Sequence, residues 1–203
     1  GFLTGIGPEN VEQQLSRLCQ GDYRTIDRVF LKADLIRSGE IVRTLRALND
    51  VFVNRADKPK LSSLTVWLDD ELINDFLADG LIVASPAGST AYSLAAGGPI
   101  VEPSSRTLLL TPICPHSLTE RPLVVPDDRT IRIRVNPRNP LLLLSADGMD
   151  SQHLEPGDEI VIACDRTRAS LIQLSESSFF QSLRSKLDWG TNTSRRRRDD
   201  DAA

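Results

Sequence analysis

The sequence predicts a mainly β fold, a sandwich-like β domain with a few short helices and so α+β overall. Three observations carry this prediction. Short segments of apolar or alternating residues recur along most of the chain, turn residues punctuate them at short intervals, and helical spacing is confined to both ends and one small-residue stretch. A chain of 203 residues is long enough for one large domain or two small ones.

The first predicted elements are a helix and two β-hairpins. The helix has apolar residues at helical spacing after Pro8 and ends at Gly21. Looser alternation around the Ser38-Gly39 turn predicts one hairpin, and Asp69-Asp70 marks the turn of another. The predicted helix covers residues 8–20, and the predicted strands are residues 23–36 with 41–53 and residues 64–68 with 72–77.

The stretch from Asp79 to Pro99 is the densest in conformationally special residues. An apolar run at 81–84 predicts a buried strand, and turn residues follow it. Ser89 or Thr90 can cap a helix of about two turns that stops at Gly97-Gly98-Pro99. A helix this short is unstable alone, so packing or a ligand must hold it.

The second half of the chain predicts further short strands and one helix. The proline-rich residues 111–118 are predicted to be irregular. A helix is expected at 178–187, and a solvated, charged tail beyond Gly190. The predicted strands are residues 107–111, 130–135, 141–145, 159–164 and 169–174.

Composition excludes several classes of function. A net charge of -4 argues against a general nucleic-acid or membrane-surface binder, and no apolar run is long enough to span a bilayer. Three scattered cysteines without a Cys/His cluster indicate a reducing compartment and no structural zinc. Because Met149 is the only methionine, Gly1 is not a translation start, and we expect a fragment or a processed product.

Several polar residues are candidates for chemistry, each with an ordinary structural alternative. Backbone amides at the Ser89 helix start can bind a phosphate or a ribose, although the stretch is neither a P-loop, a dinucleotide fingerprint nor a nucleophile elbow. Spacing alone leaves ligand binding and simple packing equally open. Asn49-Asp50 can present an amide and a carboxylate to hydroxyls, but such pairs are more often turn residues. The same holds for Asp79 and Asp147, and a Ser89, His116 and Asp147 triad is disfavoured.

Taken together, these residues resemble the NAD kinase family, which phosphorylates NAD at the 2′-hydroxyl of the adenosine ribose. The family pattern DG-(apolar)2-3-STPTGSTAYSLSAGGP is closely similar to residues 79–99. The likeness continues through residues 111–118, 121–126 and 145–148, and through Phe179-Phe180 to Trp189. Asn49-Asp50 stands where the family has Asn-Glu, and residues 1–4 match the segment that links its two domains.

The resemblance implies that this chain is the β-rich, NAD-binding second domain of a cytoplasmic kinase that uses ATP and Mg²⁺ and forms homodimers or homotetramers. It implies a linker and helix from the N-terminal α/β domain at 1–22, the NAD-binding domain at 23–176 and a C-terminal helix packing back at 177–190. The charged composition of residues 191–203 predicts a disordered tail. Nucleic-acid and membrane partners are not expected. The implied substrate-binding residues are Asn49, Asp50, Asp79, Ser89, Thr90, Ala91, Tyr92 and Asp147.

The chain departs from the family pattern in three places. It contains no Gly-Gly-Asp-Gly motif, whose aspartate is implied to activate the attacking hydroxyl, so no catalytic residue and no metal ligand is expected here and the chain alone is expected to be inactive. Asp50 replaces a glutamate, and Ala87 replaces a threonine or serine. Two alternatives stay open: a non-catalytic module that binds NAD or oligomerises, and a lipid kinase of related fold, which the Thr-Ala-Tyr run disfavours.

Overall fold

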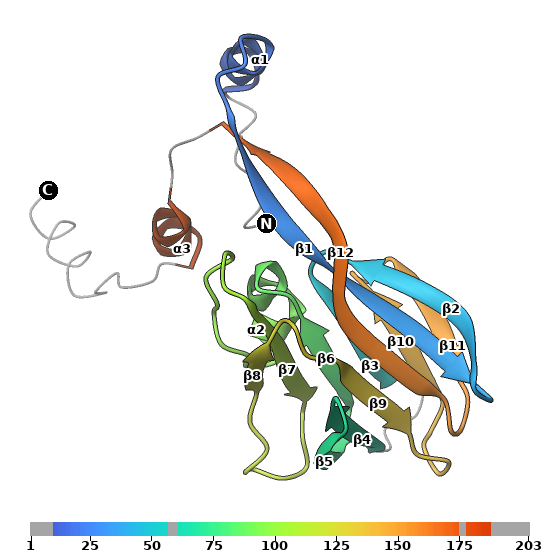
Figure 1. Ribbon diagram of the computed structural model, residues 1–203. Coiled ribbons are helices and arrows are strands. Elements are labelled where there is room, and N and C mark those ends of the chain that lie inside the picture. Colours follow the sequence, from blue (N-terminus) through green and yellow to red (C-terminus); the bar gives the residue numbers. More distant parts are fainter. Residues whose placement is uncertain (1–9, 57–60, 175–177, 188–203) are drawn as a thin grey trace, which may run out of the picture. The chain divides into compact units, whose positions relative to one another are not determined.

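The computed structural model describes residues 10–56, 61–174 and 178–187. These residues form two six-stranded antiparallel sheets and three α-helices, which confirms the predicted, mainly β fold class (Figure 1). Contacts divide the chain into two compact units, one of residues 27–169 and one of residues 1–26 with 170–203. The first unit contains the hydrophobic core and all the described candidate residues, so the site is built there.

The strand order of the two sheets follows from hairpins joined by crossovers. The first sheet has the order β2-β1-β12-β9-β4-β5 and the second the order β11-β10-β3-β6-β7-β8. The strands of the first sheet, in that order, are Glu40–Ala47, Arg24–Arg37, Glu159–Gln173, Ile131–Val135, Ser62–Leu68 and Glu71–Ala78. Those of the second are Asp150–Leu154, Leu142–Ala146, Asp50–Arg55, Gly80–Ala84, Thr107–Ile113 and Leu123–Pro126. The helices are α1 (Val11–Cys19), a 3₁₀ turn η2 (Ala87–Thr90), α2 (Tyr92–Ala95) and α3 (Phe179–Leu187).

The main hydrophobic core contains alternate side chains from strands of both sheets. Leu64 and Ile133 of the first sheet and Val53, Leu81 and Leu110 of the second belong to one buried cluster. Each such side chain stabilises the fold by roughly 1.5–3 kcal/mol when it is fully buried. This alternation is what strands with one face on a core require.

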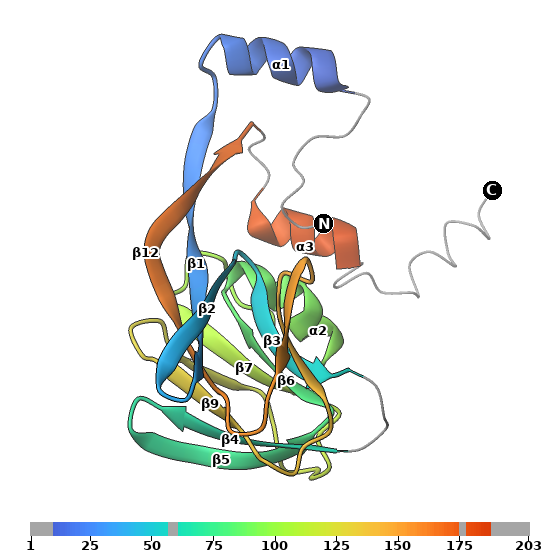
Figure 2. The same ribbon diagram turned by 90° about the vertical axis from the view of Figure 1, so that its right-hand side faces the viewer.

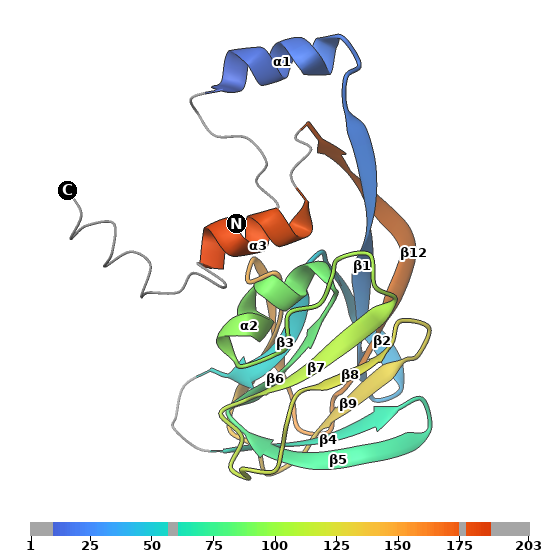
Figure 3. The same ribbon diagram turned by 90° about the vertical axis from the view of Figure 1, so that its left-hand side faces the viewer.

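Strand β6 departs from this alternation because it is buried on both faces, as are residues 108–112 of its neighbour β7. All five residues of β6 are buried, which explains why the run Gly80–Ala84 shows no alternation. On the face away from the main core, Ile82, Ala84 and Leu109 form a second cluster with Phe52 and Ala96. Figures 2 and 3 both show α2 beside β3, β6 and β7. The predicted need of this short helix for packing is therefore met by the outer face of the second sheet.

The expected strand at 41–53 is wrong, because the chain changes sheets there. Strand β2 ends at Ala47 and pairs with β1, whereas β3 begins at Asp50 and pairs with β6 and β10. The Leu48-Asn49 step lies between them. A pattern of apolar residues continues through this break because both strands contribute to the same core. The remaining predicted hairpin, β4 with β5, is confirmed.

Two other expectations about strands are also wrong. Residues 159–164 and 169–174 belong to one continuous strand, β12, because the intervening Asp165–Arg168 segment is polar but contains neither glycine nor proline. The proline-rich segment is regular as far as Ile113, since Pro112 lies in β7 opposite Leu81 of β6. Strand β8 pairs only with residues 107–110 of β7, so Pro112 needs no ladder donor on that side.

Strands β8 and β11 were not expected. Both lie at an edge of the second sheet. Strand β11 consists of mostly exposed polar residues, and β8 has only one buried residue. Strand β11 therefore leaves little apolar pattern, and β8 is a run of three apolar residues without alternation, so the sequence did not indicate either strand.

The helices expected at 8–20 and 178–187 are confirmed as α1 and α3. Residues 1–9 and 188–203 lie outside the described residues, so the predicted linker and charged tail are not described. None of the helices in the described part of the chain is long and apolar enough to cross a membrane.

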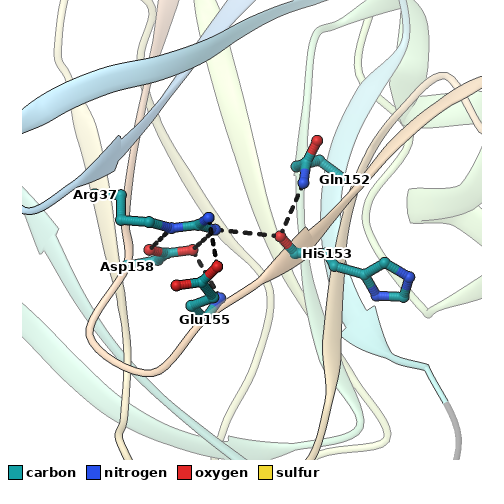
Figure 4. Close-up of polar contacts among 5 residues, drawn as sticks. All are labelled: Arg37, Gln152, His153, Glu155 and Asp158. Atoms are coloured by element: carbon teal, nitrogen blue, oxygen red, sulfur yellow. Dashed lines mark hydrogen bonds and ion pairs between the residues drawn. The ribbon is translucent and has the colours of Figure 1, made fainter.

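A buried ion pair joins β1 to the turn before β12. Asp158 is only 1% exposed and accepts hydrogen bonds from Arg37 Nε at 2.9 Å and from Arg37 Nη2 at 2.8 Å. Figure 4 shows these two contacts, together with the bond from Arg37 to Glu155 and the longer one to the carbonyl of His153. This cluster fixes one end of the sandwich and lies outside the candidate site.

Candidate functional site

The register of β3 and β6 brings two candidate segments together. Asp50 lies opposite Ala84, so the residues before β3 and those after β6 meet at one end of the strand pair. There the Ser85 N–H donates to the Asn49 carbonyl at 2.8 Å, and the Ser85 hydroxyl donates to the Leu48 carbonyl at 2.7 Å. The Asn49-Asp50 pair is therefore held against the stretch that begins at Ser85.

Asp147 reaches the same place from the β10–β11 hairpin. Its carboxylate accepts backbone N–H groups from Leu48 at 2.7 Å, Asn49 at 2.8 Å and Asp50 at 3.1 Å. Its own N–H donates to the Asp50 carbonyl at 2.9 Å. Asp147 and Gly148 have φ values of 50° and 68°, and Asp-Gly is one of the few pairs that accept two such positions in a hairpin turn.

The expected capped helix of about two turns is wrong in detail. The chain forms the 3₁₀ turn η2 and then the single turn α2, and neither has a side-chain cap. Ser89 is 0% exposed, and its hydroxyl exchanges hydrogen bonds with the backbone of Val101. The Thr90 hydroxyl donates to the carbonyl of Ala87. The side chains of Ser89 and Thr90 therefore stabilise the segment instead of capping a helix. Thr90 and Ala91 are partly exposed.

Asp50 is the electrostatically unusual group of the site. It is 3% exposed, and burial raises the pKa of its carboxyl to about 6, with the neighbouring charge of Asp147 acting in the same direction. A hydrogen bond from the Tyr92 N–H partly offsets these effects. The ionised carboxylate is poorly solvated, so a hydrogen bond from a ligand hydroxyl would stabilise it.

Tyr92 provides the aromatic surface of the site. Its ring packs edge-on against Phe52, with the ring centroids 5.1 Å apart, and Tyr92 is 37% exposed. Loss of solvation raises the pKa of the Tyr92 phenol, and the charges of Cys114, Asp50 and Asp79 add to this rise. A flat, partly exposed ring can contact a planar heterocycle.

Asp79 lies at the other end of β6. Gly80 pairs with Asn54, and Asp79 forms a 2.6 Å ion pair with Arg55. The structure of this one chain therefore brings together Asn49, Asp50, Asp147 and the residues from Ser85 to Tyr92, but leaves Asp79 at the far end of the strand. The charges of Asp50 and Asp79, at the two ends, both raise the pKa of the Tyr92 phenol.

The described residues offer neither a metal cage nor a nucleophilic triad. Within the described ranges no group of three or more His, Cys, Asp and Glu side chains is placed to hold a metal ion. The Ser89 hydroxyl and the Asp147 carboxylate both bond to backbone groups, so they do not form a triad with His116. The arrangement can bind and orient hydroxyl and aromatic groups, but it contains no activated nucleophile.

Sequence reasoning missed three residues of this site. Ser85 and Gly88 lie in a stretch interpreted only as a turn, although both contact the Asn49-Asp50 backbone. Phe52 was treated as one apolar residue of a strand, but it lies under the Tyr92 ring. The Ser-Pro-Ala-Gly run was the available signal, because such turn residues next to a buried strand often hold another loop.

Comparisons with known proteins identify the family of the chain. Residues 48–174 match the family model described as the ATP-NAD kinase C-terminal domain. An NAD kinase of Heliobacterium modesticaldum is 43% identical over 190 residues, covering 94% of this chain and 67% of that protein. An NAD kinase of Moorella thermoacetica is 42% identical over 94% of this chain and 61% of its own length. The chain thus spans about two thirds of the curated relatives it matches.

Two solved structures are similar over nearly the whole chain. Yeast NADH kinase complexed with NADH superimposes with a TM-score of 0.87 and 32% identity, over 95% of this chain and 57% of that one. An NAD kinase from Archaeoglobus fulgidus in complex with ATP gives a TM-score of 0.74 and 27% identity, over 93% and 70%. Sequence and fold therefore point to one conclusion: this chain belongs to the NAD kinase family and contains its C-terminal domain.

Proposed function

We propose that this chain is the NAD-binding part of an NAD kinase, which transfers the γ-phosphoryl group of ATP to the 2′-hydroxyl of the adenosine ribose of NAD. The observation that carries the proposal is the packing of the Asn49-Asp50 turn against the segment from Ser85 to Tyr92. Family membership gives this geometry its chemical meaning. The yeast relative is described in complex with NADH and the Archaeoglobus relative with ATP, so both kinds of ligand occur among similar proteins.

In this proposal each candidate residue has a distinct role toward NAD. Asn49 and Asp50 bind the ribose hydroxyls, since an amide and a carboxylate offer a fixed donor and strong acceptors. Thr90, Ala91 and Tyr92 line the pockets of the adenine and nicotinamide rings, with Ser89 supporting them from below. Asp79 holds the nicotinamide side.

The chain alone is proposed to bind NAD without phosphorylating it. Phosphoryl transfer depends on positioning and charge stabilisation around the ATP phosphates, and the given sequence has no Gly-Gly-Asp-Gly run to supply them. Mg²⁺ fits as an ion that arrives with ATP, because it usually keeps phosphate and water ligands and the described residues form no cage for it. What the residues of this chain do is hold and orient the acceptor.

The test combines binding with turnover on the full chain. Calorimetric titration with NAD is expected to show saturable binding, and incubation with NAD, ATP and Mg²⁺ is expected to yield no NADP in a coupled dehydrogenase assay. Absence of NAD binding would refute the proposed function. Measurable NADP formation would instead refute the view that the catalytic groups lie outside this chain.

A non-catalytic module that binds NAD or oligomerises is the second candidate. The two candidates differ in the sequence that precedes Gly1 in the parent gene. A Gly-Gly-Asp-Gly motif there supports the kinase, and its absence supports the module. A lipid substrate is disfavoured by the Thr90-Ala91-Tyr92 run, and NAD binding in the titration would exclude it.

We further propose a homodimer or homotetramer in the cytoplasm, with residues 23–176 as the NAD-binding domain and without nucleic-acid or membrane partners. All three cysteines are free thiols, as expected in a reducing compartment, and the net charge of -4 does not attract polyanions. Light scattering after size exclusion measures the oligomeric state directly, and a strictly monomeric chain would contradict this part.

A further inference from the structure

We propose that Asp147 is a positioning residue: its carboxylate holds the backbone of residues 48–50 in the shape that presents Asn49 and Asp50 to a ligand, and it does not contact the ligand itself. This inference rests on the proposed function, because it assigns how the Asn49-Asp50 pair is held for NAD. It also revises the expectation that Asp147 binds substrate directly.

The hydrogen bonds of Asp147 already occupy its carboxylate. Oδ1 accepts the N–H groups of Asn49 and Asp50 at 2.8 and 3.1 Å, and Oδ2 accepts that of Leu48 at 2.7 Å. Three successive N–H groups converging on one anion form an anion-binding concavity of the kind that elsewhere receives phosphates. Here the protein supplies the anion itself. A ligand must therefore be recognised by the side chains of Asn49 and Asp50, since the backbone N–H groups of both residues already donate to Asp147.

Ser85 completes the support from the opposite side. Its hydroxyl donates to the Leu48 carbonyl at 2.7 Å and accepts the Gly88 N–H at 3.1 Å, while its own N–H donates to the Asn49 carbonyl at 2.8 Å. Asp147 thus binds the donors of the turn, and Ser85 binds its acceptors. Because Ser85 is completely buried, water does not compete for its hydrogen bonds.

The position of Asp147 also gives it an electrostatic effect that a purely steric support would lack. Its charge lies beside the buried Asp50 carboxyl and raises the pKa of that group, after burial itself. The Tyr92 N–H acts in the opposite direction, and the Tyr92 phenol is the other titratable group that senses the Asp50 charge. Removing the charge of Asp147 must therefore move the ionisation of Asp50 to lower pH.

The first test is the Asp147→Asn variant of the full chain, titrated with NAD over a range of pH. Asparagine keeps the shape of the side chain but replaces one carboxylate oxygen by an NH₂ group, which cannot accept hydrogen bonds. The backbone of residues 48–50 therefore loses part of its support. We expect the dissociation constant at neutral pH to rise by about 10- to 100-fold, as small misplacements of binding groups do. We also expect the pH midpoint of NAD binding to fall, which a structural role alone would not cause.

Asp150→Asn is the matched control. Asp150 lies three residues further along the same hairpin, is 51% exposed in its side chain and pairs with Arg43 instead of the 48–50 backbone. It removes the same charge without touching the turn. Its NAD affinity and pH midpoint are expected to equal those of the unmodified chain.

A second readout needs no ligand and separates this inference from the proposed function. Amide hydrogen exchange followed by NMR is expected to show loss of protection at Leu48, Asn49 and Asp50 in Asp147→Asn, but not in Asp150→Asn. If no form of the chain binds NAD, the proposed function fails. The exchange protection of these three backbone N–H groups still shows whether Asp147 holds the turn. Ser85→Ala removes one support on the other side without introducing a donor, and it is expected to weaken NAD binding less than Asp147→Asn does.

Two outcomes would overturn the inference. One is an Asp147→Asn chain that binds NAD as tightly as the unmodified chain. The other is weaker binding with unchanged protection of the three amides, which would assign Asp147 to direct contact with the ligand. If Asp147→Asn does not fold, Ser85→Ala takes its place, and unchanged NAD affinity together with unchanged amide protection in that variant counts against the inference.

Discussion

Gly88 lies so close to Asn49 that the two backbones are in direct contact. A β-carbon on Gly88 would lie 2.0 Å from the carbonyl oxygen of Asn49 and 2.8 Å from its Cα atom. Both residues sit on stretches held by Ser85, so neither can move without disturbing the other. A residue without a side chain is therefore required at position 88 for the two halves of the site to meet.

Gly88→Ala is accordingly expected to push the segment around residue 88 away from Asn49. Forcing a methyl group into this contact should lower the free energy of unfolding by about 1–3 kcal/mol and weaken NAD binding. Gly39→Ala is the control, since Gly39 has a φ of 84° but open space around it and lies in the β1–β2 turn. Urea unfolding is expected to show a loss in both variants, and calorimetry a loss of affinity in Gly88→Ala alone. Equal NAD affinity in the two variants would contradict the close-contact argument.

Tyr92→Ala is expected to weaken NAD binding without unfolding the chain. The ring is partly exposed and rests on Phe52, so its removal deletes a stacking surface but leaves the main core intact. Stacking of an aromatic side chain on a base is worth about 1–3 kcal/mol, which corresponds to a loss of roughly 5- to 150-fold in affinity. The Tyr92 N–H to Asp50 remains in this variant. Calorimetry measures the affinity, and circular dichroism verifies folding.

Tyr92→Phe separates the ring from the hydroxyl. It keeps the flat surface and its contact with Phe52, so we expect NAD affinity within a few-fold of the unmodified chain. A loss as large as that of Tyr92→Ala would show that the phenolic oxygen, and not the ring face, binds the ligand. Unchanged affinity in Tyr92→Ala would place the pocket elsewhere.

Arg37→Met tests the buried ion pair of Figure 4. Without Arg37 the Asp158 carboxylate loses two charge-assisted hydrogen bonds and keeps only the backbone N–H of Glu155, at 2.8 Å. A buried charge that loses its partner is strongly destabilising. We therefore expect a clear fall in melting temperature, with NAD affinity unchanged at temperatures where the variant is folded.

Arg43→Met is the matched control for Arg37→Met. Arg43 pairs with Asp150 at 2.7 Å, and both side chains are largely exposed, so the pair contributes little to stability. Thermal unfolding of the two variants is the comparison to make. A similar melting temperature for both would show that burial of Asp158 carries no particular weight.

Much of the fold could be predicted from local pattern, and the failures share one physical cause. Turn residues with positive φ, such as Ser38 and Asp69, mark two of the hairpins correctly, and the alternation of β9 is plain in the sequence. The break at Leu48 was missed because β2 and β3 serve different sheets yet face the same core. Which sheet a strand joins is decided by tertiary packing, and local pattern does not record it.

The site was predictable only in part, because its hydrogen bonds are long-range. The resemblance indicated Asn49, Asp50 and Tyr92, but the bonds from Ser85 to Leu48 and from Leu48 to Asp147 join residues 37 and 99 positions apart. The sequence indicated a turn at Asp147-Gly148 but not the hydrogen bonds of the Asp147 side chain. Positive φ at Asp147 explains the local turn, whereas its three amide partners explain why an aspartate stands there.

Asp50→Asn is expected to stabilise the chain while weakening its binding to NAD. Burial raises the pKa of the Asp50 carboxyl to about 6, above the ordinary value of 3.8, so ionised Asp50 destabilises the native state at neutral pH. Two pKa units correspond to about 2–3 kcal/mol of stability. Asparagine removes the charge but keeps an oxygen for the Tyr92 N–H. We therefore expect NAD binding, and not folding, to require a carboxylate at this position.

The sign of the pH dependence distinguishes stability from binding. Between about pH 4 and 6 the native chain holds a proton on Asp50 that the unfolded chain releases, so the destabilisation by this group fades as the pH falls through 6. NAD affinity should change in the opposite direction, because protonation removes an acceptor for the ribose hydroxyls. Urea unfolding and calorimetric titration at several pH values, compared with Asp50→Asn, measure both slopes. An Asp50→Asn chain that is no more stable than the unmodified chain at neutral pH, or that binds NAD equally well, would show that Asp50 is an ordinary turn residue.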